Sequence, residues 1–261
     1  MKSTITIHRF VLGFGLGLLL ALGVGFAVVA AGPARAEVPS DPNLVVVELF
    51  TSQGCSSCPP ADAFLGELAK RSDVLALSLH VDYWNYIGWP DPFSSPAMTA
   101  RQRAYSQSLG HRYVYTPQMV IDGKFQEVGS RTAKVERAIA GAKRQAPSKL
   151  RIKVVSKGAG KAVVRIPASK SSATATVWLV GFDNLHTTPI TSGENSGRTI
   201  SYHNVVRAIR PIGSWGGNAT EISFDITHQG DAEFDNCAII VQRGRAGPIL
   251  GAVALPMSSL R

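Results

Sequence analysis

The chain has 261 residues, of which 45% are hydrophobic, and a formal net charge of +9. Its basic residues are scattered without long runs, which indicates a solvated basic surface rather than a nucleic-acid site. The cysteines are Cys55, Cys58 and Cys237, too few for a framework of structural disulfides.

The chain begins with the features of an export signal. A basic start with Lys2 and Arg9 precedes an uncharged apolar run over residues 10–31, and small residues then flank a cleavage position before Glu37. We therefore predict a signal peptide over residues 1–36 and an exported protein, periplasmic or secreted. The alternative is an uncleaved membrane anchor, because the apolar run is long enough to span a bilayer.

The first folded stretch predicts a β-α-β unit. Residues 44–50 are typical of a strand buried on both faces, residues 59–70 have a helical period with prolines in the first turn, and residues 74–81 predict a second buried strand. Such a unit predicts parallel strands. We expect next an aromatic loop at 82–96, a helix at 97–109, a hairpin of strands at 118–121 and 124–128, and a helix at 132–143.

The pattern changes after residue 147, where alternating apolar runs replace helical periods. These runs predict an all-β unit, most simply a sandwich. The stretch from 188 to 218 is polar and has no clear assignment, and within it residues 200–209 fit either a strand or a short helix. The predicted strands cover 150–155, 162–166, 175–182, 221–226, 238–242 and 249–255.

Cys55 and Cys58 lie where the first strand ends and a helix begins. Thiol–disulfide exchange needs a thiolate that attacks and a second thiol that resolves the mixed disulfide. Cys55, at the start of the helix, is the expected attacker because unpaired N–H groups and the helix dipole favour its anion. Cys58, one turn further on, is the expected resolving cysteine.

A second motif supports this interpretation. Thr116-Pro117 stands directly before a predicted strand, and with the β-α-β start it makes residues 44–146 resemble a thioredoxin-like domain. The resemblance implies a cis bond between Thr116 and Pro117, opposite the cysteines, beside which a substrate chain pairs. It also implies a proton-accepting role for Glu48, although Glu48 stands one residue further from Cys55 than the usual pattern, and a buried acid without a redox role is the alternative.

Longer motifs narrow the resemblance to one family. The stretches TSQGCSSCPPAD, HVDYWNYIGWPDPFSSP with TARQRAY, YTPQMVIDG, and GENSGR with NVVR resemble the exported bacterial family called domain of unknown function 1223. This resemblance implies a thioredoxin-like α/β domain followed by an all-β, sandwich-like domain, and it implies no known reaction. We place these domains at 44–146, with an aromatic insertion at 82–110, and at 148–257.

Other residues have both a functional and a structural interpretation. Trp84 and Trp89 in the aromatic loop are candidates for a substrate platform beside Cys55, or they fill the core under a long insertion. Cys237, next to an apolar run, is expected to be a buried and inert thiol. The polar residues Glu194, Arg198, Asn204 and Arg207 form either a buried hydrogen-bond network or a binding site that faces the cysteines.

Three functions remain open from the sequence. The first is an extracytoplasmic thiol–disulfide oxidoreductase that acts on protein thiols or disulfides of the cell envelope and needs no cofactor. The second is a soft-metal protein that holds Cu(I) between the thiolates of Cys55 and Cys58; His80 or His111 would be a further ligand, but neither has a spacing that requires it. The third is a non-enzymatic envelope-binding module in which the disulfide is structural. No membrane partner is expected unless the signal segment is uncleaved.

Overall fold

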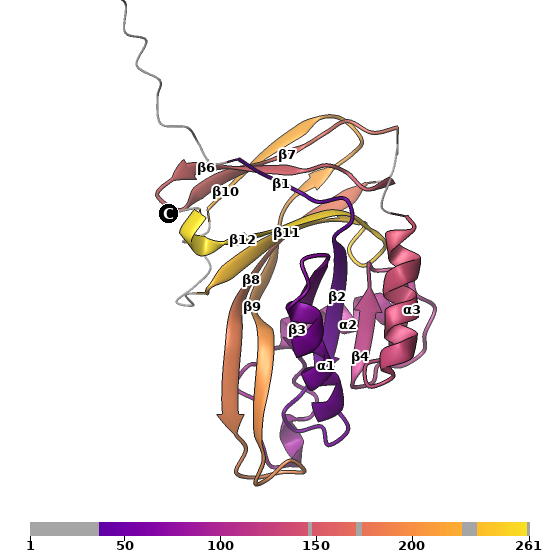
Figure 1. Cartoon of the computed structure of the whole chain (residues 1–261), viewed down its shortest axis with the longest axis vertical. Coiled ribbons are helices and arrows are strands. Elements are labelled where there is room, and N and C mark those ends of the chain that lie inside the picture. Colours follow the sequence, from indigo (N-terminus) through magenta and orange to yellow (C-terminus); the bar gives the residue numbers. More distant parts are fainter. Residues whose placement is uncertain (1–36, 146–147, 171–173, 226–233, 260–261) are drawn as a thin grey trace, which may run out of the picture. The chain divides into compact units, whose positions relative to one another are not determined.

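The computed structural model describes residues 37–145, 148–170, 174–225 and 234–259 (Figure 1). The predicted signal peptide at 1–36 therefore lies outside the described residues. The helices of the described part are α1 (Pro59–Ala69), α2 (Pro96–Ser108) and α3 (Thr132–Lys143), with 3₁₀ turns η1 (Asn85–Ile87) and η3 (Met257–Ser259). Its strands are β1 (Glu37–Pro39), β2 (Val45–Thr51), β3 (Val74–His80), β4 (Gln118–Ile121), β5 (Phe125–Val128), β6 (Lys153–Gly158), β7 (Lys161–Ile166), β8 (Ala175–Pro189), β9 (Thr199–Trp215), β10 (Thr220–Asp225), β11 (Asn236–Arg243) and β12 (Ile249–Pro256).

The predicted β-α-β unit is confirmed. All seven residues of β2 and of β3 are buried, and the two strands are parallel, with Val45 opposite Val74. Pro59 and Pro60 open α1, where the first backbone N–H groups need no partner within the helix, so proline costs little there. Its apolar face, with Ala61, is buried against β2, which fixes the direction in which the preceding turn leaves the sheet.

Strands from both halves of the chain share one eight-stranded sheet, in the order β12-β11-β8-β9-β3-β2-β4-β5. The two halves join where β9 runs parallel to β3, with Val205 opposite Ser78. The expected fold class, a thioredoxin-like α/β domain followed by an all-β sandwich-like domain, is therefore wrong. The molecule is mostly β, because β9 covers the open edge of β3 with backbone hydrogen bonds and continues the same sheet.

Helices cover both faces of the part of the sheet that contains β2 and β3. Helices α1 and α3 pack on one face, and α2 packs on the other through Met98 and Tyr105. A second sheet, β1-β6-β7-β10, packs against β8, β11 and β12 through a separate apolar core that includes Val164 and Ile239. The apolar face of each strand thus meets either a helix or the second sheet.

The stretch without a clear assignment forms most of a long hairpin. Strand β8 continues to Pro189, and β9 covers 199–215, so residues 200–209 are strand and not helix. The hairpin tip, residues 190–198, lies at the end of the sheet where β2 ends (Figure 1). This placement brings a segment from the second half of the chain onto the cysteines.

Among the described helices, no helix has both the length and the apolar character needed to cross a membrane.

Candidate functional site

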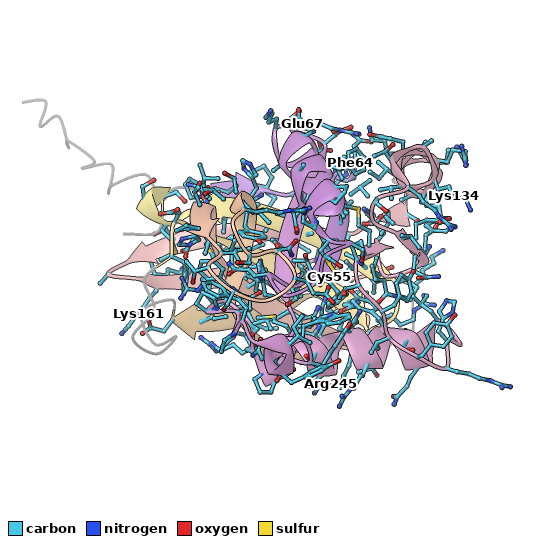
Figure 2. The ribbon with its side chains drawn as sticks, turned by 90° about the horizontal axis from the view of Figure 1, so that it is seen from below. Cys55, Phe64, Glu67, Lys134, Lys161 and Arg245 are labelled. Atoms are coloured by element: carbon cyan, nitrogen blue, oxygen red, sulfur yellow. A yellow bond between two sulfur atoms is a disulfide. The ribbon has the colours of Figure 1, made fainter. Side chains whose placement is uncertain are left out.

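The predicted redox pair is a disulfide between Cys55 and Cys58, with Cα atoms 5.4 Å apart, in the turn that joins β2 to α1. Figure 2 shows Cys55 at the end of α1 opposite to Glu67. Only 1% of Cys55 and 0% of Cys58 is exposed, whereas Ser56 and Ser57 between them are exposed. A partner therefore meets the two serines before it meets either sulfur.

A chain of hydrogen bonds ends on the sulfur of Cys55. Trp84 Nε1 donates to Thr116 Oγ1 over 2.7 Å, and Thr116 Oγ1 lies 3.2 Å from Cys55 Sγ. An indole N–H is a donor only, so the threonine hydroxyl accepts from Trp84 and directs its own proton at the sulfur. The expected cis bond between Thr116 and Pro117 is confirmed. Ser57 Oγ lies 3.3 Å from the same sulfur, so two hydroxyl groups face Cys55.

The second tryptophan of the aromatic loop also holds the cysteine turn. Trp89 Nε1 donates to Gln53 Oε1 over 2.8 Å, and the Gln53 backbone N–H donates to Asp91 over 2.8 Å. Both Trp84 and Trp89 are half-buried, whereas 82% of Tyr86 between them is exposed. Trp84 thus positions Thr116, and Trp89 positions Gln53. The role of either tryptophan as a substrate platform stays a prediction.

The hairpin tip closes the other side of the turn. Asn195 is 1% exposed, and its Nδ2 donates to Gln53 O over 2.9 Å and to Cys55 O over 3.0 Å. Glu194 Oε2 accepts from the backbone N–H of Ser56 over 3.2 Å. Of the polar residues singled out in this region, Glu194 faces the cysteines, whereas the side chains of Asn204 and Arg207 bond to Ala76 O and to Asp183.

A buried polar cluster that the sequence did not indicate lies behind Cys58. Asp62 follows Cys58 by one helical turn, its backbone N–H donates to Cys58 O, and only 2% of it is exposed. Neither carboxylate oxygen makes a hydrogen bond of normal length within the described residues. Burial raises the pKa of Asp62 to about 7, an effect that outweighs the opposing effects of the nearby His80 and Thr51. Residues 51, 78, 80 and 202 also carry buried polar atoms without a partner in this part of the chain: Thr51 Oγ1, Ser78 Oγ, His80 Nε2 and Tyr202 Oη.

His80 connects this cluster to the cysteine turn. Its Nδ1 lies 2.6 Å from Asp91 Oδ2, the same oxygen that accepts the N–H of Gln53, and its ring packs against Tyr202 with centroids 4.9 Å apart. The spacing of Asp62, four residues after Cys58 on a helix, was the available sequence signal. It was missed because an acid in the first turn of a helix usually serves only the helix dipole.

Glu48, the predicted proton acceptor, has other partners. It accepts from Arg101 Nε over 2.5 Å and from Arg101 Nη2 over 3.0 Å, and it also accepts from the Tyr105 hydroxyl. Arg101 and Tyr105 belong to α2, and no hydrogen bond between described residues joins Glu48 to either cysteine. The structure therefore does not bring Glu48 together with the sulfurs, and its proton-accepting role stays a prediction.

Cys237 is free and 0% exposed, and burial raises the pKa of its thiol to about 12, as expected for an inert cysteine. Among the described residues, no three His, Cys, Asp or Glu side chains are grouped so that they could hold a metal ion. A soft metal at this site would have to rely on the two thiolates of Cys55 and Cys58.

Comparisons with known proteins agree with the motifs. Residues 46–242 match the family described as protein of unknown function (DUF1223). A crystal structure of protein AGR_C_4864 from Agrobacterium tumefaciens is 33% identical, with a TM-score of 0.69 over 81% of this chain and 93% of that one. HBP35 of Porphyromonas gingivalis is 14% identical, with a TM-score of 0.54 over 82% of this chain and 74% of that one, so this likeness concerns the fold alone. No curated protein matches. The chain therefore belongs to the DUF1223 family.

Proposed function

We propose that this protein is an extracytoplasmic thiol–disulfide oxidoreductase that acts on protein thiols or disulfides of the cell envelope through Cys55 and Cys58. The observation that carries this proposal is the hydroxyl of Thr116, which Trp84 orients so that its proton points at Cys55 Sγ. A hydrogen bond donated to a thiolate favours the charged form, and a disulfide that is only structural does not need one. The extracytoplasmic location rests on the export signal expected at residues 1–36.

The proposed exchange moves two electrons. The Cys55 thiolate attacks a partner disulfide, forms a mixed disulfide and releases one partner thiolate, which takes up a proton. The Cys58 thiol then loses its proton and attacks Cys55 Sγ, which releases the second partner thiol and leaves the disulfide between Cys55 and Cys58. In the reverse direction a partner dithiol is oxidised and the pair is reduced.

Asp62 suits the second step as the group that takes the proton of Cys58. It lies one helical turn beyond Cys58, it is buried, and neither of its oxygens makes a hydrogen bond of normal length with another described residue. With a pKa raised to about 7 by burial, its carboxylate is available as a base near neutral pH and returns the proton easily. Glu48, by contrast, is already bound by Arg101 and Tyr105.

A purely structural disulfide is the second candidate, because 1% or less of each cysteine is exposed. In that case the chain is an envelope-binding module, and the disulfide ties the start of α1 to the turn. The two functions differ in how the reduced pair behaves: a structural pair has ordinary thiols and exchanges only when the protein unfolds.

The deciding experiment uses a Cys237→Ser variant, so that only the pair reacts. The protein is equilibrated with glutathione redox buffers under native conditions, and the reduced fraction is measured by mass spectrometry after acid quenching. The pH dependence of Cys55 alkylation is measured separately in the reduced protein. We expect a reversible equilibrium and an alkylation midpoint below about 8.5, the ordinary value for cysteine. Exchange only under denaturing conditions, with an ordinary midpoint, would overturn the proposal in favour of a structural disulfide.

A further inference from the structure

The tip of the β8–β9 hairpin, residues 190–198, has no part in the exchange steps above, yet it is fastened to the cysteine turn. Asn195 is buried, and its amide donates to the carbonyl oxygens of Gln53 and Cys55. Arg198 Nη1 donates to Asn195 Oδ1 over 3.2 Å, which turns the NH₂ group of the amide towards the turn. Two hydrogen bonds therefore fix Asn195 against the backbone of the cysteine turn, and a third, from Arg198 within the tip, orients its amide.

Glycines allow the tip to come this close. Gly193 has φ of 74° and Gly197 has φ of 82°, in the region that side chains rarely adopt. A Cβ atom at Gly193 would lie 3.1 Å from Trp89 Cβ, closer than packed side chains normally come. Ser192 Oγ also donates to Gly88 O over 2.6 Å, so the tip is held by the aromatic loop as well as by the cysteine turn.

This fastening places Glu194 next to the reactive cysteine. Glu194 Oε2 accepts from the N–H of Ser56, the backbone amide that follows Cys55. Free N–H groups at the start of a helix normally favour a cysteine anion. Here a carboxylate occupies one of these donors and adds a negative charge of its own. Glu194 has no ion pair within the described part of the chain that would neutralise this charge.

We propose that Glu194, held in place by Asn195, destabilises the Cys55 thiolate and so shifts the pair towards the disulfide, which makes the reduced protein the stronger electron donor. The oxidised sulfurs carry no charge, so the repulsion acts on the reduced form only. A less stable thiolate makes the disulfide harder to reduce, just as a stabilised thiolate makes a strong oxidant. This inference rests on the proposed function. Glu194 is a positioning residue in it and touches no substrate.

The central variant is Glu194→Gln in the Cys237→Ser background, because a glutamine oxygen still accepts from Ser56 N–H while the charge is lost. We expect the alkylation pKa of Cys55 to fall by about half a unit, which is about a threefold rise in thiolate at a pH below the midpoint. In glutathione buffers held at a pH above the midpoint, where Cys55 of the reduced protein is ionised, the equilibrium should also shift by about threefold towards the reduced protein. Glu194→Asp keeps the charge near the turn and should stay close to the wild type.

Glu67→Gln is the matched control, because Glu67 is an exposed acid near the far end of the same helix, where it forms an ion pair with Lys70. It should change neither the alkylation pKa nor the equilibrium. An unchanged alkylation pKa in Glu194→Gln, with correct folding confirmed by circular dichroism, overturns the inference. If the wild type shows no native exchange, the proposed function fails, and the alkylation pKa of Cys55 still decides whether Glu194 acts on its thiolate.

Discussion

Two buried acids lie near the cysteine turn, and their surroundings differ sharply. Glu48, on one strand, has an arginine, a tyrosine hydroxyl and, through Arg101 and Tyr105, the amide of Gln242 around it. Asp62, on the helix that follows the cysteines, makes no hydrogen bond of normal length within the described residues. A carboxylate whose bonds are made contributes to a specific packed core, whereas one without bonds is costly to keep. From this difference we expect Glu48 to stabilise the fold, and we propose that Asp62 takes part in the exchange.

Disruption of the Glu48 site, whose hydrogen bonds are made, should cause the largest loss of folding stability. Arg101→Met leaves Glu48 buried without its cation, and we expect a loss of about 3–5 kcal/mol in the free energy of unfolding, measured by urea titration. Arg101 Nη1 is already without a partner in the described structure, so the pair is well but not completely bonded. The double variant Glu48→Gln with Arg101→Met removes both charges and should recover part of the loss. A cost below about 1 kcal/mol for Arg101→Met would contradict a structural role.

The double variant also tests the predicted role of Glu48 as proton acceptor. If Glu48 serves only the fold, the rate of native exchange with glutathione should stay within about twofold of the wild type, since the sulfurs keep all their hydrogen bonds. A tenfold slower exchange in a correctly folded double variant would indicate that Glu48 does accept a proton during the exchange.

The buried Asp62 carboxyl should make the free energy of unfolding depend on pH. The pKa of Asp62 is about 7 in the folded protein and near 3.8 in the unfolded chain, so between these values the folded state holds a proton that the unfolded state has lost. Stability therefore falls as pH rises from about 4 to 7, by up to about 4 kcal/mol, and is level above that. Asp62→Asn should remove this slope, measured by urea titration at pH 4 to 8.

Asp62→Asn should at the same time slow the resolving step. We expect release of glutathione from the mixed disulfide on Cys55 to become about tenfold slower at pH 7, followed by stopped-flow quenching and mass spectrometry. The matched control is the first step, alkylation of Cys55, which should be unchanged. Equal rates of release in variant and wild type would exclude Asp62 as the proton acceptor.

A smaller effect tests the bond from Thr116 to the sulfur. Thr116→Val keeps the shape and loses the hydroxyl, so the alkylation pKa of Cys55 should rise by about one unit, which corresponds to about 1.4 kcal/mol. Thr116→Ser keeps the donor and is the control. If valine and serine variants give the same pKa, the hydroxyl does not stabilise the thiolate.

The smallest effect belongs to Ser57. Its hydroxyl also faces Cys55 Sγ, but the side chain is exposed and water replaces it readily. Ser57→Ala should raise the alkylation pKa of Cys55 by only a few tenths of a unit. An effect as large as that of Thr116→Val would mean that the two hydroxyls stabilise the Cys55 thiolate equally.

Local patterns predicted the local elements well. The predicted helix at 132–143 matches α3, and the predicted strand at 118–121 matches β4, because hydrophobic periodicity and the Asp122-Gly123 turn determine both. The cysteine pair and the cis bond at Pro117 were also predicted. All of these depend on neighbours in sequence or on motifs that are themselves short.

The missed features depend on contacts between distant residues. Arg101 stands 53 residues after Glu48, and Asn195 stands 140 residues after Cys55, so no spacing in the sequence indicates either pair. The sequence alone does not decide between strand and helix for residues 200–209, because this stretch is polar and alternates poorly; pairing with β8 and β3 makes it a strand. The burial that raises the pKa of Asp62 likewise depends partly on β9, which packs beside α1 and which the sequence patterns did not place there.

The pairing of β3 with β9 has a consequence for biosynthesis. Strand β3 ends at His80 and β9 begins at Thr199, so the ribosome must make about 120 further residues before the partner strand is available. At about 5–20 residues per second, the edge of β3 waits for roughly 6–24 seconds. An unpaired apolar edge is a template for aggregation during that time. We therefore expect the nascent chain to depend on a holding chaperone until the hairpin emerges, and a chain that stops after α3 to be insoluble.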